Sequence, residues 1–140
     1  MKLVVDTNIV FSAIWNSNGR IANLLIRKTS LNLYSPTFLL VELTNHQHKL
    51  SKKLCLEPSQ FLELKHLITR QIRFVEEERI SSQNWIKANE LTKTIDSDDV
   101  AFVALCLELN CPLWTGDKRL SKSLTEVKSL QTYEIYELLQ

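Results

Sequence analysis

Glycine is scarce in this chain of 140 residues, in which only Gly19 and Gly116 occur. A glycine-rich loop of the kind that cradles phosphate groups in nucleotide-binding proteins is therefore excluded. A large excess of charge of either sign is absent too, because 17 Lys and Arg residues stand against 16 Asp and Glu residues. The chain lacks the strongly basic composition of many nucleic-acid-binding domains. Binding of nucleic acid would therefore have to use a local basic patch.

Cysteine pairs and long apolar runs are missing as well. Cys55, Cys106 and Cys111 form no Cys-x-x-Cys motif, and their odd number favours a reducing compartment. Cys106 lies inside an apolar run, which predicts a buried thiol. No apolar run approaches the roughly 20 residues of a membrane span, and an expected strand from residue 2 onward leaves no room for a targeting peptide. We therefore expect a cytoplasmic protein.

The length and the apolar pattern predict one domain, residues 1–140, of the α/β class. Short apolar runs alternate with segments of helical periodicity, as in chains that form a parallel sheet. Strands are expected at residues 2–5, 31–34, 72–75, 112–115 and 127–130. Helices are expected at residues 9–15, 20–28, 35–48, 57–71, 81–91, 100–109, 118–124 and 133–139. Ser35 and Pro36 are expected to cap and open the third of these helices.

The first strand leads directly into three polar residues, Asp6, Thr7 and Asn8. Its uninterrupted apolar run suits a strand that is covered on both faces. In open α/β sheets, ligand-binding and catalytic residues gather at the carboxyl ends of the strands. Asp6 is therefore a candidate site residue, although Asp, Thr and Asn also open turns and cap helices.

Further carboxylates are expected at the same edge of the sheet. Asp117 follows the strand at residues 112–115, and parallel strands joined by right-handed crossovers end at one edge. The helix before that strand begins after Asp98 and Asp99, so its start must lie near this edge, and periodicity does not separate the two residues. Glu42 belongs to the helix after the second strand and leans toward its buried side.

Each carboxylate also has an ordinary structural explanation. Glu42 alone is typical of a solvated helix position, Asp117 of a helix cap, and Asp96 and Asp98 of capping residues. Their joint placement nevertheless favours a shared site. Carboxylates that lie close together need a compensating charge, and Mg²⁺ or Mn²⁺ supplies it through hard oxygen ligands. Such sites hydrolyse phosphodiester bonds.

Four motifs taken together resemble the PIN-domain family. They are V-V-D-T-N, P-x-x-L-x-x-E-L, D-D-V-A-F-V-A-L-C-L-E-L and P-L-W-T-G-D-K-R-L, in this order along essentially the whole chain. The resemblance implies a five-stranded, mostly parallel sheet in a three-layer α/β/α sandwich. It also implies an endoribonuclease that depends on Mg²⁺ or Mn²⁺, often the toxin of a bacterial toxin–antitoxin pair.

The resemblance also implies roles for single residues. Asp6, Glu42, Asp99 and Asp117 match the four acids that would be catalytic residues and metal ligands, and this match favours Asp99 over Asp98. The implied reaction is attack of a metal-bound water on an RNA phosphate, which leaves 5′-phosphate and 3′-hydroxyl ends.

Supporting positions can be matched in the same way. Asn8 and Thr115 stand where the family has polar residues that support the acids by hydrogen bonding. Arg119 stands where many relatives carry a further aspartate, which favours one metal ion over two.

RNA and a small antitoxin protein are the partners that the resemblance implies. Candidates for contact with the RNA backbone are Lys118, Arg119 and Lys122. A second basic cluster, which equally fits a solvated helix end, consists of Lys49, Lys52 and Lys53.

The remaining features concern surfaces. His46 and His48 are two residues apart on a helix and face different directions, so we expect surface residues rather than metal ligands. The apolar helices around Phe61 and Trp85 suggest a homodimer. No helix indicates a free groove for an antitoxin.

Two other functions compete with the nuclease. One is a catalytically silent PIN fold that binds RNA or a protein, against which the complete set of acids argues. The other is an α/β domain in which a strand-end aspartate accepts a phosphoryl group. A phosphatase of that kind needs a second aspartate at the position of Asn8.

Overall fold

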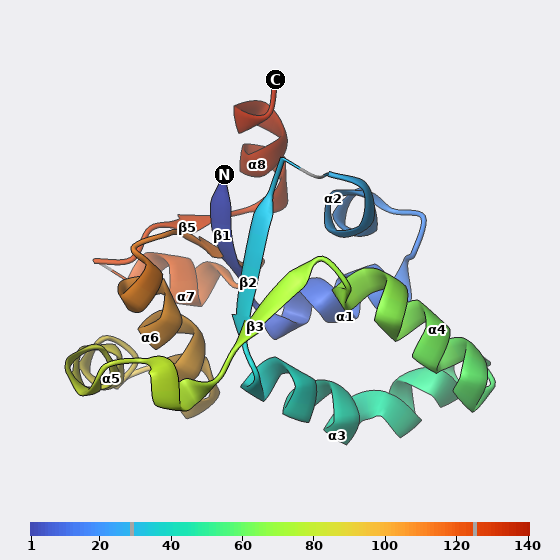
Figure 1. Cartoon of the computed structure of the whole chain (residues 1–140), viewed down its shortest axis with the longest axis horizontal. Helices are drawn as coiled ribbons and strands as arrows, with labels where there is room; N and C mark the ends of the chain where they lie inside the picture. The colour runs from blue at the N-terminus through green and yellow to red at the C-terminus, as the bar shows by residue number, and fades with distance from the viewer. Residues whose placement is uncertain (29, 125) are drawn as a thin grey trace.

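A computed structural model describes residues 1–28, 30–124 and 126–140. Within these residues, five parallel strands form one sheet in the order β3-β2-β1-β4-β5 (Figure 1). The expected α/β class and parallel sheet are confirmed. The strands are β1 (Lys2–Val5), β2 (Asn32–Pro36), β3 (Ile72–Val75), β4 (Leu113–Trp114) and β5 (Ser129–Leu130).

Helices cover both faces of the sheet, which confirms the three-layer arrangement. On one face α1 contacts α2, α3 and α4, and on the other α6 packs on the sheet and on α5. The α-helices are α1 (Thr7–Trp15), α2 (Arg20–Arg27), α3 (Phe38–Lys53), α4 (Pro58–Thr69), α5 (Ser82–Leu91), α6 (Val100–Leu109), α7 (Lys118–Ser123) and α8 (Thr132–Leu138). Two short 3₁₀ helices are η1 (Glu77–Arg79) and η2 (Ser97–Asp99).

Buried core side chains come from the strands, from α6 on one face of the sheet and from α1, α2, α3 and α4 on the other. Val4 and Val5 of β1 have no exposed surface, as expected for a strand covered on both faces. The first half of α6 is apolar on all sides, and its residues from Ala101 to Cys106 are buried. The predicted burial of Cys106 is thereby confirmed. This core holds the strand ends in fixed positions because buried side chains are densely packed.

The start of α3 differs from the prediction. Ser35 and Pro36 were expected to cap and open this helix, whereas both belong to β2, in which Pro36 pairs with Val75 of β3. The helix begins at Phe38, whose backbone N–H donates to the Glu77 carboxylate (2.8 Å). The cap therefore comes from a side chain 39 residues away in sequence, which local pattern cannot reveal. The other predicted elements agree with the structure to within a few residues, except that α3 runs on to Lys53.

The homodimer suggested by the helices around Phe61 and Trp85 stays a prediction. Phe61 has no exposed surface and belongs to the core. Trp85 is half-buried, and its indole N–H donates to the backbone carbonyl of Glu77 (3.3 Å). The large apolar side chains that these helices expose are Leu62, Leu67 and Ile86.

Within the residues that the structure describes, no helix is long and apolar enough to cross a membrane.

Candidate active site

Asp6 lies at the carboxyl end of the central strand and is 5% exposed. Its backbone N–H donates to the Trp114 carbonyl of β4 (3.1 Å). Its side-chain Oδ2 accepts a hydrogen bond from the buried hydroxyl of Thr115 (2.8 Å). Burial raises the pKa of Asp6, while the Thr115 hydroxyl and the N–H groups of Thr7 and Asn8 lower it. Asp6 precedes α1, and no hydrogen bond of normal length and angle joins its side chain to the first N–H groups of that helix.

Asp117 is connected to Asp6 through Thr115. The backbone N–H of Asp117 donates to the Thr115 hydroxyl (3.1 Å), which in turn donates to Asp6. The Asp117 side chain accepts from the N–H groups of Arg119 (2.9 Å) and Leu120 (3.2 Å), both through Oδ1, and so caps α7. Asp117 is thus a helix cap, and its charge also contributes to the raised pKa of Asp6.

Glu42 approaches the same edge from α3, which begins just beyond the tip of β2 (Figure 1). It is half-buried, and its Oε1 accepts a hydrogen bond from the Thr7 hydroxyl (2.5 Å). Burial raises the pKa of Glu42, the Thr7 hydroxyl lowers it, and the charges of Asp98 and Asp6 raise it further. The bond from Thr7 to Glu42 was not foreseen. The only sequence signal for it was the position of Thr7 directly after Asp6.

Asp99 ends η2 at the start of α6 and is the most perturbed of the four acids. Burial raises the pKa of Asp99 to about 7, and the negative charges of Asp6, Asp96, Asp117 and Glu42 act in the same direction. No cationic side chain is among the groups that shift this pKa.

The neighbours of Asp99 behave differently. Asp98 is exposed, and its backbone N–H donates to Asp96 Oδ1 (3.0 Å), which makes Asp96 the cap of η2 as expected. Asp99, and not Asp98, therefore points into the protein.

The four carboxylates influence one another without forming a ready-made metal cage. Among the described residues, no three His, Cys, Asp or Glu side chains lie close enough together to hold a metal ion as they stand. Several of the oxygens face hydroxyl or amide donors instead of one another. The donor chemistry still fits Mg²⁺ or Mn²⁺, because the groups are carboxylates and those that burial perturbs have raised pKa values. A cation would require these side chains to turn toward a common point.

Asn8, the two histidines and the basic candidates singled out in the sequence are all exposed. Asn8 is exposed, and within the described residues only its backbone N–H, not its side chain, acts on Asp6. His46 and His48 are exposed, and the His46 ring lies 5.3 Å from that of Phe11. All six basic candidates are exposed, with Lys118, Arg119 and Lys122 on α7 and Lys49, Lys52 and Lys53 on α3.

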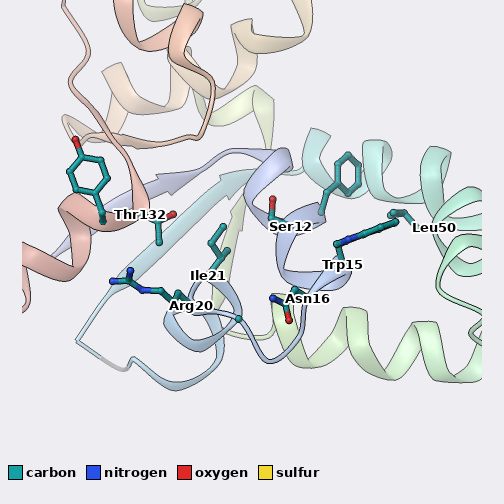
Figure 2. A pocket seen from close by; sticks show the side chains of 10 residues that line it. Ser12, Trp15, Asn16, Arg20, Ile21, Leu50 and Thr132 are labelled. Carbon is teal, nitrogen blue, oxygen red and sulfur yellow. The ribbon is translucent and has the colours of Figure 1, made fainter.

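Two cavities lie outside the set of four carboxylates, none of which lines either of them. One of about 380 Å³ is lined by residues next to Glu42 and Asp99 in the chain. A larger one of about 760 Å³ lies at the far end of α1, where Trp15 and Leu50 face Arg20 and Thr132 across it (Figure 2). No helix in the sequence indicated such a groove. Two aromatic residues of its lining, Trp15 and Tyr133, are the sequence feature that could have indicated it. Their side chains are 57% and 55% exposed.

Comparison with known proteins identifies the fold. A family model described as the PIN domain matches residues 4–138. No curated protein sequence gives a significant match. Similar solved structures include VapBC2 from Rickettsia felis bound to a DNA fragment from its promoter (TM-score 0.73, 16% identity, 94% of this chain and 98% of that chain). DNA-bound VapBC from Salmonella typhimurium is also similar (0.74, 15%, 94% and 98%), as is VapBC-1 from nontypeable Haemophilus influenzae (0.70, 20%, 95% and 99%).

Proposed function

The chain belongs to the PIN-domain family, and on this premise we propose that it is an endoribonuclease that hydrolyses RNA phosphodiester bonds with Mg²⁺ or Mn²⁺. The observation that carries the proposal is the gathering of Asp6, Glu42, Asp99 and Asp117 at one edge of the sheet, where their charges act on one another. A fold alone would not supply this argument, because unrelated functions share folds.

In this proposal the four acids have different roles. Asp6, Glu42 and Asp99 would hold one cation, with Asp117 completing its surroundings directly or through water. When bound, the cation would supply a water of lowered pKa and offset the charge on the leaving oxygen. Arg119 stands outside the acid set and extends from α7 into solvent, which fits one cation rather than two.

Hydroxyl groups of this chain keep the acids in position. Thr115 donates to Asp6 and thereby fixes the orientation of its carboxylate. Thr7 does the same for Glu42. Such supporting hydrogen bonds orient metal ligands and tune their basicity. Lys118, Arg119 and Lys122, which are exposed on α7 just after Asp117, would bind RNA phosphates in this proposal.

The biological role that we propose is that of a toxin held in check by a small antitoxin protein. Support comes from the fold, which is shared with VapBC toxin–antitoxin complexes from three bacteria. The 760 Å³ cavity offers a surface for such a partner, because two of its aromatic side chains, Trp15 and Tyr133, are left largely exposed.

One observation favours a second candidate function, a PIN fold that binds RNA or a protein without cleaving it. Asp6, Glu42 and Asp117 each accept a hydrogen bond in the structure, and the described residues contain no finished metal site. A silent binding module would keep these bonds permanently, whereas a nuclease must exchange some of them for a cation.

One experiment distinguishes the nuclease from the binding module. Wild-type protein is incubated with RNA in Mg²⁺, in Mn²⁺ or in EDTA, beside Asp6→Asn and the control Glu78→Gln, which alters an exposed carboxylate of η1. The nuclease proposal expects metal-dependent products with 5′-phosphate ends from wild type and control, and none from Asp6→Asn. Cleavage by Asp6→Asn would refute the assigned site. Metal-independent binding without cleavage by wild type would establish the second function.

A further inference from the structure

The cavity of about 380 Å³ is lined in part by residues of α3 and η2, the elements that carry Glu42 and Asp99. Val41 and Asp98 line it, and each is the immediate chain neighbour of an acid, Glu42 and Asp99 respectively. Asp98 is also close enough to Glu42 for its charge to raise the pKa of that carboxyl group. A ligand in this cavity would therefore lie near Glu42, one of the acids that would hold the metal ion for attack of water on the phosphate.

The walls of this cavity are apolar and held in place. Phe38 and Trp85 line it together with Val41, which is 51% exposed. The Phe38 ring packs edge-on against buried Phe102, with 6.3 Å between centroids. The Trp85 indole is anchored by its bond to the Glu77 carbonyl. Fixed aromatic walls of this kind suit a flat ring, and RNA bases stack on aromatic side chains.

One carboxylate in the cavity is available for a ligand. Glu77 already accepts hydrogen bonds from the Thr37 hydroxyl and the Phe38 N–H. The exposed Asp98 side chain, by contrast, has no hydrogen bond within the described residues. An ionised carboxylate offers two acceptor oxygens and no donor. Its best partner is a group with two donors side by side, which among the bases only guanine presents, through N1–H and N2–H.

We propose that this cavity binds a guanine base of the RNA substrate next to the cleaved phosphodiester. The base lies between Phe38 and Trp85, and its N1–H and N2–H donate to the Asp98 carboxylate. The proposal rests on RNA being the substrate. A phosphate is disfavoured in the cavity by the charges of Glu77 and Asp98. The other occupant with paired donors is an arginine side chain of a partner protein, and its binding is one outcome of the test below.

The test measures binding without cleavage. Guanosine, inosine and adenosine are titrated into ¹⁵N-labelled, metal-free protein, and the indole N–H signal of Trp85 and the amide signals of Ser97, Asp98 and Ala101 are followed. Inosine differs from guanosine only in lacking the N2 amino group. We expect guanosine to bind about 10-fold more tightly than inosine, as the loss of a hydrogen bond to a charged group implies, and adenosine to bind more weakly still. Equal affinities would overturn the proposal, as would saturable shifts with ethylguanidinium and none with guanosine.

Variants test whether the preference for guanosine over inosine arises in this cavity. Asp98→Asn replaces one acceptor oxygen by a donor and should bring the guanosine and inosine affinities to within about 2-fold of each other. The control Glu78→Gln removes an exposed charge outside the cavity and should keep the difference. Val41→Trp fills the cavity and should abolish the shifts, whereas Leu62→Trp alters an equally exposed position on α4 and should not. A preference that survives in Asp98→Asn would overturn the proposal.

The two proposals fail separately. Nucleosides contain no phosphodiester bond, so their binding does not depend on catalysis. Guanosine binding without RNA cleavage would refute the nuclease and leave the base site. RNA cleavage without a preference for guanosine in the binding test would support the nuclease and refute the base site.

Discussion

Replacement of Asp99 by asparagine is expected to stabilise the metal-free protein, and only at neutral or alkaline pH. In the folded protein the pKa of Asp99 is raised from 3.8 to about 7, first by burial and then by the neighbouring carboxylates. Between these two values the folded state keeps a proton that the unfolded state has lost. The free energy of unfolding therefore falls as the pH rises from about 4 to about 7, and the full penalty applies above that range.

The magnitude follows from the shift. A difference of roughly 3 pKa units corresponds to about 4 kcal/mol, but Asp99 is only half-buried, and screening by solvent reduces the expected penalty to about 1–2 kcal/mol. For a domain of this size, 1 kcal/mol shifts Tm by about 3 °C. Asp99→Asn in EDTA should thus raise Tm by about 3–6 °C at pH 8 and leave it nearly unchanged at pH 5, where Asp99 is protonated in the folded wild type.

Thermal unfolding followed by circular dichroism at pH 5, 6, 7 and 8 tests this expectation. Glu78→Gln serves as the control because its carboxylate is exposed and lies outside the site. Addition of Mn²⁺ at pH 8 should raise the Tm of wild type and have little effect on Asp99→Asn, which lacks a ligand. A stabilisation of equal size at pH 5 and pH 8 would refute the reasoning, because it would show that the charge of Asp99 is not its source.

Two further predictions concern the support of the site and the partner surface. Thr115→Val keeps the buried shape but removes the hydroxyl that orients Asp6, so RNA cleavage and Mn²⁺ affinity should fall about 10- to 100-fold. Thr44→Val, at an exposed position of α3, should retain both, and an equal loss in the two variants would contradict the assigned role. Trp15→Arg should weaken binding of the proposed antitoxin protein by more than about 10-fold while RNA cleavage by the free chain continues. Leu138→Arg, equally exposed on α8, is its control, and unchanged binding in Trp15→Arg would exclude the cavity as the contact.

The sequence predicted the frame of the site because that frame depends on chain geometry. Apolar residues 3–5 identified a central strand, and parallel strands must end at one edge, so Asp6 and Asp117 were both expected at that edge. The position of Asp99 near the same edge followed from the direction of the next strand. These inferences need only the order of the elements.

The contacts that finish the site could not be predicted in this way. The bond from Thr7 to Glu42 joins residues 35 positions apart, and the cap of α3 comes from Glu77 instead of the adjacent Ser35. The 760 Å³ cavity is assembled from α1, α2, α3 and α8. Each depends on how side chains from distant segments meet, and a periodic pattern along one segment carries no information about that.

The connection of Thr115 to Asp6 spans 109 positions of the chain. Asp6 is therefore synthesised early in this domain, yet the hydroxyl that orients it and the neighbouring Asp117 leave the ribosome only when most of the domain has been translated. A ribosome-bound fragment that ends before Trp114 contains three of the four acids and lacks the central strand pairing through Trp114 that holds Asp6. A cell that makes this protein is thus exposed to a completed site only after most of the domain has been read from the message.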